Sequence, residues 1–300
     1  MFTALVSLIM AMLSIFFDLG HPFRALLRFG LSPNFSSMMG WMIFLYSAYF
    51  LLLLIEMYFV FMKGRQVNSS PAKILRIVGV IGIFLAVYAI MTEGALFAVI
   101  KAKPFWNTPL FPLMFVLEAL LSGGALITVL TFFFDPDRGS AEHKDLVKFL
   151  GRIVLGLLCL YVLFFLSEVL VAMYGKIPSH IESYKFIFSG QYAPFFWIGQ
   201  VFIVVVIPLL IFTFKGKSAL AVTIASSLIV LGFVFVKLNL VVPAGIVPEF
   251  AGLRTAYTDS HLTFTYFPSL MEWLLELWIL SIGMFLFLSG RKLLRLFKAS

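Results

Sequence analysis

Acidic residues inside apolar runs are the side chains of this sequence best suited to chemistry. Glu56, Glu118 and Glu168 each lie within a run of Leu, Phe and Ile. A carboxylate inside a bilayer is costly, so it usually faces a bundle interior or a water cavity, where it pairs with a cation or carries protons. We therefore predict a proton relay of these three residues. A structural ion pair is the simpler alternative, and Lys237, also inside an apolar run, could provide its cation.

Histidines in loops are a second possible source of proton exchange. His21, His180 and His261 fall in three separate polar connections. Imidazole exchanges protons near neutral pH. A single loop histidine is usually just solvated, but three on one side of the molecule favour proton exchange with a ligand bound there.

The sequence offers few ligands for metals. It contains one cysteine, Cys159, and none of its four histidines lies inside an apolar run. Iron–sulfur clusters need several cysteines, and a haem between transmembrane helices needs axial histidines inside the bundle. We expect no metal site, haem, iron–sulfur cluster or internal disulfide in this chain.

Composition defines the elements that must position these residues. Hydrophobic residues make up 62% of the 300 residues and charged residues 12%, against about 45–50% and about 25% in soluble domains. The 36 Phe outnumber the 22 Lys and Arg. A soluble enzyme, a nucleic-acid-binding protein and a disordered chain are excluded, and the sequence predicts an all-α, polytopic integral membrane protein.

Eight segments are long and apolar enough to cross a bilayer, which takes roughly 20 residues. The chain is expected to be a single membrane domain, 1–300, with helices at about 1–17, 41–63, 73–92, 109–134, 149–174, 194–214, 218–240 and 268–290. Backbone groups in lipid must be paired within their own segment, and the runs lack the alternation of barrel strands. Helices are therefore the predicted structure.

The distribution of basic residues predicts the orientation. The predicted connections on one side, together with the C-terminal tail, hold roughly twice as many Lys and Arg as those on the other side. Basic residues accumulate in cytoplasmic loops. Both termini are therefore expected in the cytoplasm, and the longer connections 18–40, 93–108, 175–193 and 241–267 outside.

Two local motifs indicate a family. Residues 18–24 read Asp-Leu-Gly-His-Pro-Phe-Arg and are followed by Pro-Asn at 33–34 and Ser-Ser-Met at 36–38; residues 266–272 read Tyr-Phe-Pro-Ser-Leu-Met-Glu. These stretches resemble the NrfD family, which contains the membrane subunits of polysulfide reductase-type complexes. The second motif favours the branches related to the Hyb, Dsr and Hmc complexes.

The resemblance implies a fold and a function. The fold would be two four-helix bundles, with a further helix upstream of the first segment. The chain would be a cofactor-free subunit of a respiratory oxidoreductase in a bacterial or archaeal cell membrane. It would bind menaquinone or ubiquinone as substrate and exchange electrons with an iron–sulfur subunit beside a catalytic or cytochrome subunit. On this basis we hypothesise that quinone binds near the outer face at Asp18, His21, Arg24 and Tyr266, with His21 and Asp18 as catalytic groups. Arg24 is expected to hold the 18–40 connection by pairing with Asp18 or with a helix end more than to contact the quinone.

Other functions remain open on sequence grounds. A proton-coupled transporter or ion channel could use the same buried acids, although transporters usually have broken helices in both halves, and only Pro208 is expected to interrupt one. Quinone chemistry could also drive proton translocation through Glu56 and the other acids. A purely structural anchor is a third possibility, and a lipid-modifying transferase is disfavoured because no nucleophile–base pair stands out.

Overall fold

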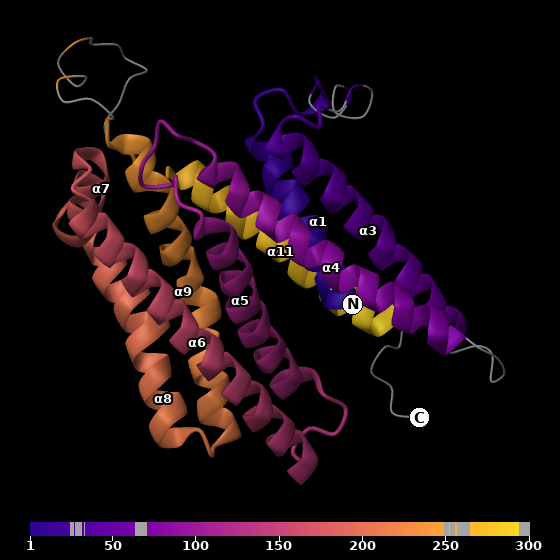
Figure 1. The fold of residues 1–300 in the computed structure, drawn as a ribbon. Helices are drawn as coiled ribbons and strands as arrows, with labels where there is room; N and C mark the ends of the chain where they lie inside the picture. The colour runs from indigo at the N-terminus through magenta and orange to yellow at the C-terminus, as the bar shows by residue number, and fades with distance from the viewer. Residues whose placement is uncertain are drawn as a thin grey trace. The chain divides into compact units, whose positions relative to one another are not determined.

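All regular structure in the described part of the chain is helical (Figure 1). The computed structural model describes residues 1–24, 27, 32, 34–63, 71–248, 252, 256 and 265–293. The helices form two compact units: unit 1 contains Met1–Leu96 and the C-terminal helix, and unit 2 contains Phe97–Tyr266. The predicted all-α class is confirmed.

The described residues of unit 1 form four long helices. They are α1 (Phe2–Asp18), α3 (Met38–Lys63), α4 (Pro71–Ala98), whose last two residues belong to unit 2, and α11 (Leu270–Leu293). Helix α1 packs on α3 through Leu5, Leu8, Leu53 and Met57. It also lies along α11, where the rings of Phe2 and Phe287 stack with centroids 6.1 Å apart.

The described residues of unit 2 form four long helical rods and one short helix. Its elements are α5 (Phe111–Phe134), α6 (Ala141–Gly175), α7 (Pro178–Ser189), η1 (Phe195–Val206), α8 (Ile207–Lys215) and α9 (Ala219–Ile246). The π-helix η1 continues directly into α8, so these two elements form one rod. Buried Leu121, Leu158, Val204, Val222 and Ile229 form the core between the rods. In their long helices, the described residues of the two units thus agree with the two four-helix units that the resemblance implied.

Seven helical segments of the described residues are long and apolar enough to cross a membrane. They are Met38–Phe59, Ile74–Ala98, Phe111–Phe134, Ala141–Gly175, Phe195–Lys215, Ala219–Ile246 and Leu270–Lys292. Helix α1 is also apolar but has 17 residues, the lower end of the usual range for a span. These segments support the predicted polytopic membrane protein.

Side-chain chemistry explains several helix boundaries. The side chains of Ser140 and Ser218 accept hydrogen bonds from backbone N–H groups at the starts of α6 and α9, as N-cap residues do. Pro178 lies at the first position of α7, where proline removes no helical hydrogen bond. Helix α7 occupies the connection 175–193, in which the sequence predicts no helix.

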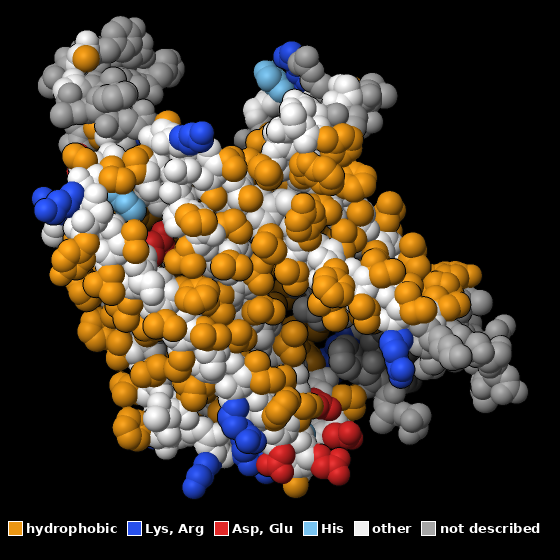
Figure 2. All heavy atoms as spheres, viewed as in Figure 1, with side chains coloured by type: hydrophobic (Ala, Val, Ile, Leu, Met, Phe, Trp, Pro, Cys, Tyr) orange, Lys and Arg blue, Asp and Glu red, His pale blue; other side chains and the backbone are white. Residues whose placement is uncertain are grey.

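Charged side chains separate from the apolar surface along unit 2. Figure 2 shows hydrophobic side chains over the middle of its helices and charged side chains gathered at the end with the α5–α6 connection. Asp137, Arg138, Glu142, Lys144 and Asp145 are exposed there. This pattern fits helices whose middles contact lipid and whose ends contact water.

Candidate functional site: a buried polar cavity in unit 2

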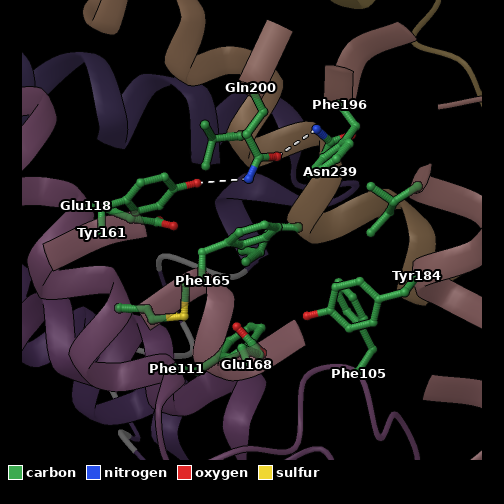
Figure 3. Close-up of a pocket in the computed structure, with 14 residues that line it drawn as sticks. Phe105, Phe111, Glu118, Tyr161, Phe165, Glu168, Tyr184, Phe196, Gln200 and Asn239 are labelled. Carbon is green, nitrogen blue, oxygen red and sulfur yellow. Dashed lines mark hydrogen bonds between the residues drawn. The ribbon is translucent and has the colours of Figure 1, made fainter. Parts of the chain in front are cut away.

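A small cavity lies among α5, α6, α7, η1 and α9 of unit 2 (Figure 3). Its volume is about 30 Å³, enough for about two water molecules at roughly 10–15 Å³ each. Aromatic rings form much of its wall, and six polar side chains face it: Glu118, Tyr161, Glu168, Tyr184, Gln200 and Asn239.

Helical spacing accounts for the lining. On α5, Phe111, Met114 and Glu118 follow one another at intervals of three and four residues, and so do Tyr161, Phe165 and Glu168 on α6. Residues three and four apart share one face of an α-helix. Each helix therefore presents one carboxyl group at the cavity face.

An ion pair satisfies one of the two carboxylates. Lys237 Nζ lies 2.7 Å from Glu118 Oε2 and 4.0 Å from the centroid of the Phe115 ring. Glu118 is 1% exposed, and burying an unpaired charge is costly. The ammonium group compensates the carboxylate charge, as the alternative of a structural ion pair anticipated.

A chain of three neutral side chains crosses the cavity wall (Figure 3). The Gln200 Nε2 group donates to the Tyr161 hydroxyl at 2.9 Å, and Asn239 Nδ2 donates to Gln200 Oε1 at 2.9 Å. Gln200 comes from the π-helix η1, and π-helical turns are frequent at functional sites. Asn239 precedes Pro243 by four residues, and proline cannot donate an α-helical hydrogen bond to its carbonyl. Both amides thus come from irregular helical segments.

The second carboxyl group has an oxygen without a partner. Within the described residues, Glu168 Oε1 and Asn239 Oδ1 are buried and form no hydrogen bond. Glu168 is 7% exposed and Asn239 4%. Most buried polar atoms in proteins are hydrogen-bonded, often to ordered water, so these two acceptors mark the cavity as a place for a polar ligand.

Helix α7 closes one side of the cavity with titratable groups. Tyr184 lines it, and His180 packs against Tyr184 and Phe105 at ring distances of 5.5 and 5.9 Å. Burial lowers the pKa of His180 and raises that of Tyr184. His180 is therefore a buried neutral imidazole, in contrast to the solvated loop residue considered from sequence. His261 lies outside the described residues.

Unit 1 contains a separate set of polar contacts between α3 and α4. The Tyr46 hydroxyl donates to Glu93 Oε2 at 2.8 Å. Glu56, 7% exposed, lies against α4 beside Gly82, where a Cβ atom would be 3.5 Å from its Oε1 atom. This is an ordinary contact distance, so the carboxyl group packs directly against the α4 backbone. Glu56 is thus buried in a different unit from Glu118 and Glu168.

Comparison with known proteins identifies the family. The family model described as "Polysulphide reductase, NrfD" matches residues 1–249. The chain belongs to the NrfD family. The predicted family is confirmed, and it agrees with the apolar helices in describing a multi-pass membrane protein.

Two relatives align with nearly the whole NrfD-family chain. A selenate reductase subunit of Mesobacillus selenatarsenatis is 32% identical over an alignment of 324 residues, which covers 96% of this chain and 74% of the relative. The Hdr-like menaquinol oxidoreductase integral membrane subunit of Archaeoglobus fulgidus is 27% identical over 311 residues, covering 96% and 73%. Both names are those of oxidoreductase subunits.

The predicted quinone-site residues of this NrfD protein lie at exposed positions. Asp18 ends α1, and His21 and Arg24 follow it in unit 1; Tyr266 belongs to unit 2. All four are exposed. Among the described side chains, no ion pair joins Arg24 to Asp18, and the Tyr266 carbonyl accepts from the Tyr192 hydroxyl at 3.0 Å. The four residues are therefore not assembled within one unit, and their role stays a prediction.

The sequence prediction missed the neutral part of the unit 2 cavity. Tyr161, Gln200 and Asn239 carry no charge at neutral pH, so a prediction based on ionisable residues inside the apolar runs does not include them. Two amides in otherwise apolar segments were the available signal. No group of three or more His, Cys, Asp or Glu positioned for a metal occurs in the part of the chain that the structure describes.

Proposed function

We propose that this chain is the membrane subunit of a multi-subunit respiratory oxidoreductase, binding quinone or quinol and exchanging electrons with a partner iron–sulfur subunit. Membership of the NrfD family supports the proposal most strongly. A relative aligned over 96% of this chain is named as a menaquinol oxidoreductase membrane subunit.

The turn that follows α1 is the proposed quinone site. Asp18, His21 and Arg24 are polar and exposed there. Phe16 lies beside Phe23 at 5.7 Å, and Phe17 beside Trp278 at 5.4 Å. Aromatic rings suit a flat ligand ring, and the polar groups can bind its oxygens. Tyr266 is retained as a further proposed contact.

Quinol oxidation defines what the proposed site must do. Each quinol that becomes quinone releases two electrons and two protons. His21 or Asp18 would accept protons from the ring hydroxyls, because a general base must act near the working pH. The electrons would pass to the iron–sulfur subunit, and quinone reduction would run the same steps backwards.

The unit 2 cavity suits protons better than quinone. A volume of about 30 Å³ holds water but not an aromatic ring. We therefore assign proton transfer to Glu118 and Glu168, and to Glu56 a separate role in unit 1 toward the cytoplasmic half. The distribution of basic residues supports cytoplasmic termini, and relatives from Mesobacillus selenatarsenatis and Archaeoglobus fulgidus support residence in a bacterial or archaeal cell membrane.

Quinone binding to the purified chain tests the proposal. A fluorescent quinol analogue is titrated against protein in lipid nanodiscs. Saturable quenching is expected, with at least tenfold weaker binding in His21→Ala and Asp18→Asn. Asp137→Asn, an exposed carboxylate at the α5–α6 connection, is the matched control and should bind normally. Absence of saturable binding by folded wild-type protein would contradict the proposal.

A proton-coupled transporter is the second candidate. The π-helical winding of η1 and Pro243 in α9 favour it, because transporters place ion sites at interrupted helices. Liposomes containing only this chain discriminate the two functions. Ion or proton flux without any redox partner would support the transporter, whereas flux that requires quinol and an electron acceptor would support the oxidoreductase subunit.

A further inference from the structure

The unit 2 cavity contains more acceptor atoms than its visible donors can satisfy. Glu168 Oε1 and Asn239 Oδ1 are both buried and have no partner among the described residues. Both side chains line the cavity. Water molecules are small enough for this cavity and supply hydrogen-bond donors that such acceptors need.

Charge balance distinguishes the two carboxyl groups. Lys237 is the cation paired with Glu118 at 2.7 Å. The other titratable groups that line the cavity are Glu168, Tyr161 and Tyr184, and neither phenol offers a positive charge. A second carboxylate at Glu168 would therefore lack a cation among the lining residues, and an uncompensated buried charge costs several kcal/mol.

The protonated and the ionised forms of Glu168 differ in the free energy of burying them. A protonated carboxyl group is neutral and can donate its proton to a water molecule, and that water can donate to Asn239 Oδ1. An ionised carboxylate would leave a net negative charge among the rings of Phe105, Phe165 and Phe196. Protonation satisfies the buried atoms without a further cation.

We propose that the unit 2 cavity is a hydrated proton site, in which Glu168 holds a proton, about two water molecules join it to Asn239, and Glu118 stays ionised against Lys237. This site deepens the proton-transfer role proposed above for these two glutamates. Its existence requires neither quinone nor a partner subunit.

Proton movement within the cavity conserves its total charge. When Glu168 gives its proton through water to the Glu118 carboxylate, Glu168 becomes the anion, Glu118 becomes neutral, and Lys237 loses its partner. No net charge enters the apolar surroundings, but the transfer separates the paired charges of Lys237 and Glu118, so the state with ionised Glu168 has a higher free energy than the resting state. The hydrogen bonds of Gln200 to Tyr161 and Asn239 hold the wall in place during this exchange.

Infrared spectroscopy of the full chain in nanodiscs tests the site. A protonated buried carboxyl group has a C=O stretching band that is distinct from the bands of carboxylates. The difference between wild-type and Glu168→Gln spectra at neutral pH should contain one such band. Glu142→Gln, which replaces an exposed glutamate on the same helix, should leave the band unchanged.

Two further variants keep the test decisive. Glu168→Asp should retain the band at a shifted frequency, which covers the case in which Glu168→Gln fails to fold. Lys237→Met removes the cation, so Glu118 should also take up a proton and the intensity should rise about twofold. A Glu168→Gln spectrum that retains the full band, or an unchanged band in Lys237→Met, would overturn the proposal.

The outcome is independent of the proposed quinone chemistry. The infrared band is measured without quinone, and the quinol analogue titration is measured without reference to Glu168. A chain with the band but no quinone binding would retain the proton site and lose the proposed quinone function. A chain that binds quinone but lacks the band would retain the proposed quinone function and lose the proton site.

Discussion

Lys237 shows how a charge is accommodated inside an apolar helix. Its ammonium group contacts both the Glu118 carboxylate and the face of the Phe115 ring. A cation over a ring face gains electrostatic attraction, more so when desolvated. Two contacts of the Lys237 ammonium group therefore stabilise the ion pair. Replacing Lys237 and Glu118 separately measures what each contributes to stability.

We predict strong coupling between Lys237 and Glu118. Lys237→Met should destabilise the folded chain by about 3 kcal/mol at neutral pH, because Glu118 is left buried without a cation. Glu118→Gln should cost less, since Lys237 is only half-buried. The double variant should be more stable than the sum of the two changes predicts, by about 1–3 kcal/mol. The free energies of unfolding of the wild type, the two single variants and the double variant, measured in nanodiscs, give the coupling energy. Additive effects of the two changes would contradict the coupling.

His180 predicts a stability that depends on pH. Burial lowers its pKa in the folded chain from the ordinary 6.5. As pH falls through 6.5, the unfolded chain binds the proton before the folded chain does, so stability falls toward the lowered pKa and is retained above 6.5. His180→Phe, which keeps a ring against Phe105 and Tyr184, should reduce this loss. Unfolding midpoints measured across this pH range test the prediction. If the midpoint of the variant falls as steeply with decreasing pH as that of the wild type, His180 is not the cause of the loss.

Interrupted helices position the polar groups at the scale of elements. Helix η1 is π-helical up to Val206, and Pro208 follows at the start of α8. Proline cannot form the regular hydrogen bond to the carbonyl four residues earlier. On α9, Pro243 similarly leaves the Asn239 carbonyl without its regular donor, and the Trp106 indole donates to the neighbouring Leu240 carbonyl at 2.8 Å. These irregular segments place Gln200 and Asn239 at the cavity.

Close contact between η1 and α9 predicts a stringent requirement at Gly199. A Cβ atom there would lie 2.6 Å from Phe235 Cβ and 2.4 Å from Phe235 Cγ. The Phe235 Cβ atom cannot move without the helix, so Gly199→Ala should destabilise the protein by about 1–3 kcal/mol. Gly156→Ala is the matched control, because no atom lies within 4 Å of its Cβ position. Thermal unfolding followed by circular dichroism compares them, and equal midpoints would refute the prediction.

The whole molecule divides its chemistry between two units. Unit 1 contains Asp18, His21 and the buried Glu56, and unit 2 contains the cavity with Glu118 and Glu168. Each unit has its own buried apolar cluster. The proposed quinone reaction and the proposed proton site therefore fall in separately packed parts of the chain, which allows each to be altered alone.

Topology predicts which side of the membrane each connection faces. Replacing the exposed Lys144 with cysteine, in a chain whose Cys159 is changed to serine, should give a thiol that an impermeant reagent reaches only from the cytoplasm. The same change at exposed Lys101 should give a thiol reached only from outside, because basic residues concentrate on the cytoplasmic side. Labelling of intact and opened cells distinguishes the two sides. Labelling of both thiols from one side would contradict the orientation.

The sequence by itself determined the helical class, the family, the burial of Glu56, Glu118 and Glu168, and seven of the eight predicted membrane segments, as judged from the described residues. These follow from composition, apolar run length and local motifs, which act along the chain and need no knowledge of its packing. Tertiary structure alone decided that Lys237 pairs with Glu118, that His180 is buried, and that Gln200 and Asn239 meet. Such contacts join helices far apart in the sequence, and their partners are selected by distances that no local pattern encodes.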